Sequence, residues 1–200
     1  MNKKTTRTPK PFSFKKPTFS DLRILSGQYK GTKILSPRNS ATHPMGSREK
    51  LALFNMLNGY IKDAIVADLY AGSGALGLEA LSLGAKSVDF VEKHPDACRT
   101  IENNIKKLSL AMPASVRLHR ESIDTFLNRP GTAQRYTLIL ADPPYDIFMI
   151  DEIRRISQLL SESGILALSY PTYLDVPDLP GLKLLKNRHY AAAGIAIYQK

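Results

Sequence analysis

Short apolar runs alternate with amphipathic stretches through most of this 200-residue chain. The apolar runs predict strands at 64–69, 87–91, 115–119, 137–141 and 164–169. Apolar residues at helical spacing predict helices from Ser47 to about 59–62 and at 75–83, 95–108, 122–129 and 147–161. Repeated strand, helix, strand units indicate a Rossmann-like α/β fold, with a mostly parallel sheet and helices on both faces.

The two ends of this pattern follow a different rule. Two strand-like runs at 182–186 and 192–198 have no helix between them, which predicts a C-terminal antiparallel hairpin and a total of seven strands. Near the N-terminus, short apolar runs around Gly27 and Gly31 predict a small β-hairpin. We therefore expect a flexible arm at 1–20, a hairpin segment at 21–45 and an α/β domain at 46–200.

Positive charge is concentrated in the first quarter of the chain. The net charge is +10, and residues 1–50 alone hold 12 Lys or Arg against Asp21 and Glu49. The remaining residues balance at 16 against 16. A neutral body with a basic head suggests a polyanionic partner such as RNA, although a solubilising tail has the same composition.

Cysteine and histidine usage narrows the class of protein. Cys98 is the only cysteine, which excludes an internal disulfide and favours a reducing, cytoplasmic location. The four histidines show no metal-ligand spacing, so we expect no metal. No apolar run approaches the roughly 20 residues of a membrane span, and we expect no membrane partner and a monomer.

A glycine loop closes the first predicted strand. Residues 68–77 read DLYAGSGALG, in which Gly72, Gly74 and Gly77 have the spacing of an adenosine-cofactor loop. Glu92 follows the next strand 20 residues after Gly72, where a carboxylate can hold ribose hydroxyls. A dinucleotide and S-adenosylmethionine both fit the pattern. Asp68 favours the second, because a carboxylate before the loop opposes a pyrophosphate and suits a cationic amino-acid group.

Glu121 and Ser122 follow the third predicted strand. A third cofactor contact belongs at this position in such a sheet. An acid and a serine before a helix are equally typical of an N-terminal cap.

The segment Asp142-Pro143-Pro144-Tyr145 directly follows the fourth predicted strand and carries the most specific chemistry. An exocyclic base amine is a poor nucleophile, because its lone pair is delocalised into the ring. The Asp142 carboxylate and the Pro143 carbonyl can accept both of its hydrogens, at the strand end where ligands of open α/β sheets bind. Tyr145 can stack on an extruded base. The alternative is a strand-ending turn whose aspartate caps the next helix.

With these motifs in order, residues 22 to the end resemble the bacterial small-subunit (16S) ribosomal RNA guanine-N2 methyltransferase family, of class I fold. The resemblance includes residues 23–27, Gly31, the segment from Pro44 to Leu57, residues 68–80, residues 91–93 and residues 142–145. Residues 45–50 depart from it, since MGSREK replaces a threonine-rich segment with an acid and two arginines. Arg48 and Lys50 keep positive charge there.

The resemblance implies S-adenosylmethionine as cofactor and 16S rRNA or the small ribosomal subunit as partner. By it, the cofactor residues are Asp68, Tyr70, Ala71, Gly72, Gly74, Gly77, Glu92 and Lys93, with Glu121 and Ser122 beside the adenine. Asp142, Pro143, Pro144 and Tyr145 hold the guanine amine, and Arg23, Lys30, Lys33 and Arg48 meet RNA. Two other functions stay open: adenine-N6 methylation of DNA, and a non-catalytic rRNA-binding assembly factor.

Overall fold

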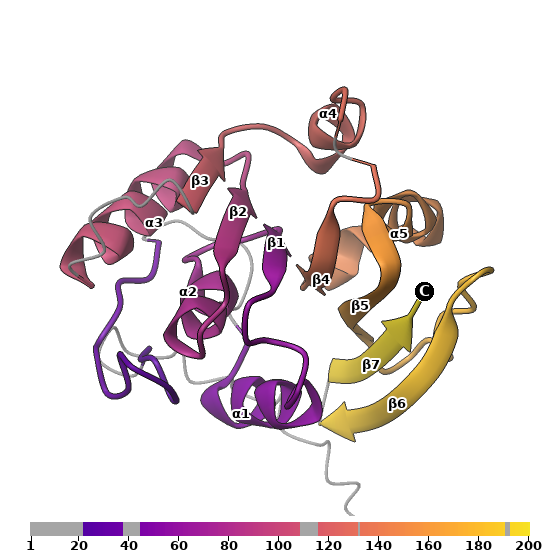
Figure 1. Ribbon diagram of the computed structural model, residues 1–200, viewed down its shortest axis with the longest axis horizontal. Helices are drawn as coiled ribbons and strands as arrows, with labels where there is room; N and C mark the ends of the chain where they lie inside the picture. The colour runs from indigo at the N-terminus through magenta and orange to yellow at the C-terminus, as the bar shows by residue number, and fades with distance from the viewer. Residues whose placement is uncertain (1–21, 38–44, 109–115, 132, 191–192) are drawn as a thin grey trace, which may run out of the picture.

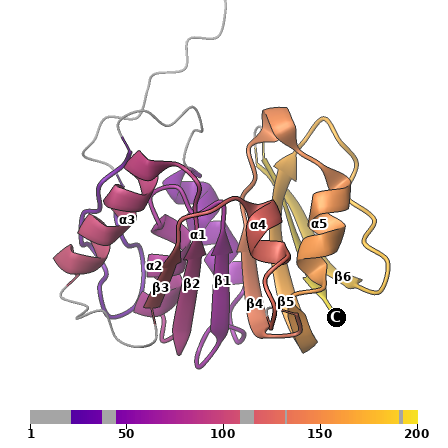
Figure 2. The ribbon, with the colours of Figure 1, turned by 90° about the horizontal axis from the view of Figure 1, so that it is seen from above.

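One seven-stranded sheet organises the molecule. The computed structural model describes residues 22–37, 45–108, 116–131, 133–190 and 193–200. Its strands are β1 (Ile65–Leu69), β2 (Ser87–Val91), β3 (Val116–His119), β4 (Tyr136–Ala141), β5 (Leu160–Pro171), β6 (Lys183–Tyr190) and β7 (Ala193–Gln199). They lie in the order β3-β2-β1-β4-β5-β7-β6, and Figure 2 shows the first five side by side in that order.

The direction of the strands confirms the predicted topology. Strands β1 to β5 pair in parallel, whereas β7 pairs antiparallel with both β5 and β6. The C-terminal ends of β1 to β5 therefore share one edge of the sheet. This Rossmann-like arrangement is the fold of class I methyltransferases.

The helices cover both faces of the sheet. They are α1 (Ser47–Met56), α2 (Ala75–Ser82), α3 (Pro95–Lys107), α4 (Ile123–Leu127) and α5 (Ile150–Ser157), with a 3-10 turn η1 (Tyr145–Ile147). Helices α1, α2 and α3 pack into one buried cluster, and α4 and α5 into the other. Alternate residues of each strand serve the two clusters, as with Ile165 in the first and Leu166 in the second. Helix α1 lies beside the β6–β7 hairpin (Figure 1). No helix in the described ranges could span a membrane.

Several predicted boundaries were wrong, mainly where backbone geometry overrides the apolar pattern. The first helix ends at Met56 rather than near 59–62, because Gly59 has φ +93 and Leu57 packs beyond the helix. The predicted helix at 147–161 is only Ile150–Ser157, and β5 begins at Leu160 with a register shift against β4. Strand β6 runs on to Tyr190, because its backbone pairs with β7 through polar residues.

The N-terminal hairpin is present but minimal. Its backbone is closed by the antiparallel bridge between Arg23 and Lys33 and by the bond from the Ile24 amide to the Thr32 carbonyl. Ile24 and Ile34 anchor it in the core, each at most 2% exposed. The predicted arm at 1–20 lies outside the described residues, as do Asp21 and residues 38–44 of the predicted hairpin segment.

Candidate active site

Three carboxylates meet at the C-terminal edge of the parallel strands. Asp68 lies near the end of β1, Glu92 directly follows β2, and Asp142 directly follows β4. Strand β1 pairs with both β2 and β4, so these ends are neighbours. Burial raises the pKa of Asp68 well above its usual range, and the charges of Asp142 and Glu92 add to the rise.

No cation balances this acidic edge from within the described part of the chain. None of its Lys, Arg or His side chains forms an ion pair with Asp68, Glu92 or Asp142. Nor do the described residues hold a group of three acidic, Cys or His side chains arranged for a metal ion. The edge is therefore suited to a ligand that brings its own positive charge.

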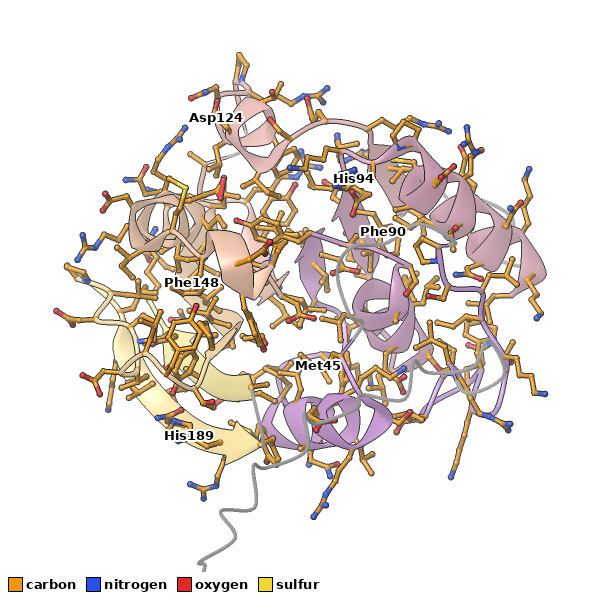
Figure 3. All side chains as sticks on the ribbon, turned by 180° about the vertical axis from the view of Figure 1, so that it is seen from behind. Met45, Phe90, His94, Asp124, Phe148 and His189 are labelled. Carbon is orange, nitrogen blue, oxygen red and sulfur yellow. The ribbon has the colours of Figure 1, made fainter. Side chains whose placement is uncertain are left out.

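Two of the acids fix the glycine loop. The Asp68 Oδ2 accepts a hydrogen bond of 2.8 Å from the Gly77 amide. Glu92 accepts 2.8 Å bonds from the amides of Gly72 and His94, one on each carboxylate oxygen. Figure 3 labels His94, the N-cap of α3, and Phe90 within β2. The loop is thus tied to the ends of two strands.

The loop backbone turns through left-handed conformations. Tyr70, Gly72 and Gly74 have φ of 59°, 57° and 76°. A Cβ at Gly72 would meet only the Tyr70 carbonyl, at 3.9 Å, so the loop is open on that side. The Ala71 amide donates to the Val91 carbonyl, which holds the loop against β2.

Tyr70 also links the loop to the opposite side of the sheet. Its hydroxyl donates a 2.8 Å hydrogen bond to Glu152 on α5. Burial is the main reason that the pKa of Tyr70 lies far above its usual value, so the phenol stays a donor.

The Asp-Pro-Pro-Tyr segment lies at the same edge. Asp142 is partly buried, and burial raises its pKa to about 6, although a hydrogen bond with Ser169 acts in the opposite direction. Pro143 is buried, whereas Pro144 is partly exposed and immediately precedes η1. Two proline nitrogens here cannot donate, which leaves the local carbonyls as acceptors.

Tyr145 is held from two sides. Its hydroxyl lies 2.5 Å from the Ser169 Oγ, and its backbone carbonyl accepts a 2.9 Å bond from the Tyr173 hydroxyl. Burial raises the pKa of Tyr145 to about 12, and the charge of Asp142 contributes. The ring is therefore fixed beside the Asp142 carboxylate.

The remaining predicted cofactor residues lie around this core. Ser122 is the N-cap of α4 and accepts a 3.1 Å bond from the Thr125 amide, so the capping interpretation is confirmed. Glu121 Oε1 lies 3.0 Å from the Arg129 Nε. Lys93 is exposed next to Glu92. Contacts of these residues with a cofactor stay predictions.

The predicted RNA-binding residues are all exposed. Arg23 and Lys33 face each other as antiparallel partners, and Lys30 lies in the turn between them. Two cations opposite each other repel, which a polyanion would relieve. Arg48 lies apart from them on α1.

Lys50 does not belong to this charged surface. It is 2% exposed and forms a 2.9 Å ion pair with Glu79 on α2, which is 1% exposed. Its ammonium also donates to the Arg23 carbonyl at 2.7 Å. The expectation that Lys50 supplies positive charge beside the RNA site was wrong, because this lysine fastens the hairpin to the body.

This fold and site agree with a family model. The model, described as "Conserved hypothetical protein 95", matches residues 22–199. The chain belongs to this family.

Three sequence relatives of this chain support its place in the family. The Haemophilus influenzae protein named Ribosomal RNA small subunit methyltransferase D is 31% identical over 185 residues, covering 90% of this chain and 94% of the relative. The Escherichia coli protein of the same name is 33% identical over 156 residues, covering 76% and 75%. YlbH of Bacillus subtilis, named provisionally as an rRNA methyltransferase, is 31% identical over 188 residues, covering 90% and 99%.

Solved structures show the same architecture. The Escherichia coli protein yhhF, described provisionally as a methyltransferase, superposes with a TM-score of 0.78 at 25% identity, covering 90% of this chain and 97% of its own. SMU.776, described provisionally as a methyltransferase and complexed with SAH, superposes with a TM-score of 0.64 at 16% identity. The match covers 75% of this chain and 48% of SMU.776, and it supports the fold alone.

Two polar residues of the site escaped the sequence analysis. Asn104 on α3 is fully buried; its side chain donates to the Ser73 carbonyl of the loop at 2.9 Å and bonds both backbone groups of Leu35. Ser169 is 3% exposed and contacts Tyr145. The sequence could have pointed to Ser169, because Ile165 and Ala167 on the same strand face are apolar and the next position on that face is a serine.

Proposed function

We propose that this protein transfers a methyl group from S-adenosylmethionine to the exocyclic N2 of a guanine in 16S rRNA. Support for rRNA methylation comes from relatives named as small-subunit rRNA methyltransferases. Support for an amine target comes from the chain itself. The single observation that carries it is the position of Asp142 and the Pro143 carbonyl at the strand edge that also bears the glycine loop.

The acidic edge fits S-adenosylmethionine. That cofactor, when bound, supplies a methyl group on a positively charged sulfur and also carries an ammonium group. Each Glu92 oxygen accepts one amide bond and has capacity left for a ribose hydroxyl. The open side of Gly72 leaves room for a ligand against the loop.

We assign cofactor binding to the loop and its flanking residues. Asp68 acts mainly by holding the loop through Gly77, since its side chain is only 1% exposed. The full proposed set is Asp68, Tyr70, Ala71, Gly72, Gly74, Gly77, Glu92 and Lys93, with Glu121 and Ser122 bordering the adenine.

In the methyl acceptor site, Asp142 and the Pro143 carbonyl accept the two hydrogens of the guanine amine. Drawing on both hydrogens restores lone-pair character to the nitrogen, and Tyr145 stacks on the base. With a pKa of about 6, Asp142 is ionised at neutral pH and can also take the proton that the nitrogen loses after transfer.

RNA binding is proposed for the exposed cations of the hairpin and α1, namely Arg23, Lys30, Lys33 and Arg48. Removing residues 1–20 should lower RNA affinity and flatten its salt dependence, because that segment is basic in sequence. Unchanged RNA binding by the truncated protein would contradict a role for those residues.

Methyl transfer can be tested directly. Small ribosomal subunits and 16S rRNA from cells lacking the gene would be incubated with the protein and tritiated S-adenosylmethionine. We expect N2-methylguanine in the RNA digest from the wild type and none from Asp142→Asn, with Asp146→Asn as a neighbouring exposed control. In a parallel reaction with DNA as the acceptor, label on adenine would favour the first alternative function, and cofactor binding without transfer to either nucleic acid would favour a scaffold.

Two substitutions separate cofactor binding from chemistry. Asp142→Ala should leave cofactor affinity near normal and abolish turnover, whereas Glu92→Ala should mainly weaken cofactor binding, because Glu92 accepts the bond from the loop amide of Gly72. Isothermal titration with S-adenosylhomocysteine and single-turnover rates measure the two effects. Equal loss of affinity in both variants would contradict the assignment.

A further inference from the structure

Ser169 occupies a position where the strand should be apolar. In β5, Ile165 and Ala167 point into the cluster beneath α1, α2 and α3, and Ser169 continues the same face. It is 3% exposed. A buried hydroxyl without partners is costly, so the bonds that Ser169 makes are the reason it can lie there.

The sheet register places Ser169 beside the acceptor segment. Ala141 at the end of β4 pairs with Leu168 of β5, so the next residue of each strand is Asp142 and Ser169. The Ser169 Oγ lies 2.5 Å from the Tyr145 hydroxyl, and the same hydroxyl is near enough to the Asp142 carboxylate to lower its pKa. One side chain on a neighbouring strand thus lies beside both groups that are proposed to hold the base.

The chemistry of the three groups favours one direction for these interactions. An ionised Asp142 can only accept, so the single Ser169 proton is best used toward that carboxylate. The Ser169 oxygen is then free to accept from the Tyr145 phenol, which stays protonated because its pKa is about 12. The order of donors that we assign therefore runs from the Tyr145 hydroxyl to Ser169 and from Ser169 to Asp142.

Resting on the function proposed above, we propose that Ser169 is a positioning residue for methyl transfer, whose hydroxyl fixes the Asp142 carboxylate and the Tyr145 ring relative to each other. Stacking by Tyr145 sets the plane of the base, and Asp142 sets the place of its amine. Both must be correct together for the nitrogen to face the methyl group, and small displacements cost large factors in rate.

The groups that face Asp142 come from several elements. Asp68 of β1 is close enough for their charges to interact, and Glu92 beyond β2 also acts on Asp68. Tyr145 is affected by the charge of Asp142 and by Glu49 of α1. No positive charge is among these groups, and burial raises the pKa of Asp142, whereas the Ser169 hydroxyl lowers it by favouring the charged carboxylate.

The test is the pH dependence of kcat/KM for guanine-N2 methylation by the full-length protein. The wild-type rate should fall below about pH 6, as Asp142 becomes protonated. In Ser169→Ala this acidic limb should move up by about one to two pH units, and kcat at neutral pH should fall by about 10- to 100-fold. Ser169→Cys, nearly equal in volume but a weaker donor, should fall between the two.

Tyr173→Phe is the matched control. It removes the other hydrogen bond to Tyr145, at the backbone carbonyl, without touching Asp142. Its acidic limb should coincide with that of the wild type. The cofactor affinity of every variant is measured by calorimetry, and an unchanged affinity shows that the fold and the glycine loop are intact.

The outcomes separate the two proposals. A wild type that makes no N2-methylguanine overturns the proposed function itself. An active wild type whose acidic limb stays in place in both Ser169→Ala and Ser169→Cys overturns only the role of Ser169. A uniform loss of rate at every pH would likewise show Ser169 to be structural packing.

Discussion

At the scale of single residues, the glycine loop shows two different reasons for glycine. Gly72 and Gly74 have positive φ, which other residues adopt only with strain. Gly77 is required for space instead, since a Cβ there would lie 2.4 Å from the Phe90 ring and 2.9 Å from the Asp68 carboxylate. Phe90 is fully buried and cannot move aside.

Gly77→Ala should therefore destabilise the protein, although alanine favours a helix by about 1 kcal/mol over glycine. Overpacking at Phe90 and a stretched bond from the Gly77 amide to Asp68 should leave a net cost of about 1–2 kcal/mol. Urea unfolding measures this cost, and titration should show weaker cofactor binding. Gly31→Ala, where φ is +87 and no atom lies within 4 Å, reports the effect of backbone strain alone. Unchanged cofactor affinity in Gly77→Ala would contradict the steric argument.

Residues whose partners are set by motif spacing could be predicted from sequence. The carboxylate of Glu92 was expected near the loop, and it bonds the Gly72 amide. Asp68 was predicted to suit the cationic end of a cofactor; its carboxylate bonds the Gly77 amide, and a contact with the cofactor stays a prediction. Ser169 and Asn104 could not be found in this way, because their contacts depend on sheet register and on packing between distant segments.

At the scale of elements, α2 joins the cofactor loop to the N-terminal hairpin. Its N-cap is Gly74 of the loop, while Glu79 in its middle accepts hydrogen bonds from the amides of Leu25 and Ser26. At its last residue, the Ser82 hydroxyl accepts from the Tyr29 amide. The pattern of apolar and polar residues predicts the helix itself. It does not predict that the buried Glu79 carboxylate on this helix binds the backbone of the distant N-terminal hairpin.

Lys50→Met should loosen this junction, because it leaves Glu79 buried without its cation. Breaking a buried pair in this way costs about 3–5 kcal/mol, and Lys50→Met/Glu79→Leu should recover part of it. Trypsin should then cut the hairpin at Lys30 and Lys33 more rapidly than in the wild type. The exposed substitution Lys62→Met serves as a control. Identical cleavage rates in Lys50→Met and the control would show that the pair does not hold the hairpin.

At the scale of the whole molecule, charge is divided between two regions with opposite needs. The chain as a whole is strongly basic, with net charge +10, yet its candidate site gathers acids that form no ion pair with any cation of the described segments. The basic hairpin suits an RNA backbone, and the acidic edge suits a cationic cofactor. Composition indicated the first of these, but the second depends on how three strand ends meet and could only be inferred from the topology.

The acidic edge must therefore cost stability, and pH reveals the amount. Burial raises the pKa of Asp142 to about 6, above its value of about 3.9 in an unfolded chain. The folded state then binds the extra proton, so the contribution of Asp142 to stability is greatest below about pH 4 and is lost as the pH rises through about 6. Asp142→Asn, which keeps the shape without the charge, should stabilise the protein by about 2 kcal/mol near pH 8 and raise Tm by about 4–8 °C.

This gain should shrink as the pH is lowered toward about 4.5, where the wild-type carboxyl is itself protonated in the folded state. Thermal melts of the two proteins across this range measure the difference, and exposed Asp175→Asn should change stability by less than about 0.5 kcal/mol at any pH. A gain from Asp142→Asn that is constant with pH would mean that the charge of Asp142 is not its source. A gain in stability that depends on pH, together with loss of methyl transfer in Asp142→Asn, would instead show that the protein keeps this carboxylate ionised at the expense of its own stability. Such a trade between stability and activity is expected of a group that serves function.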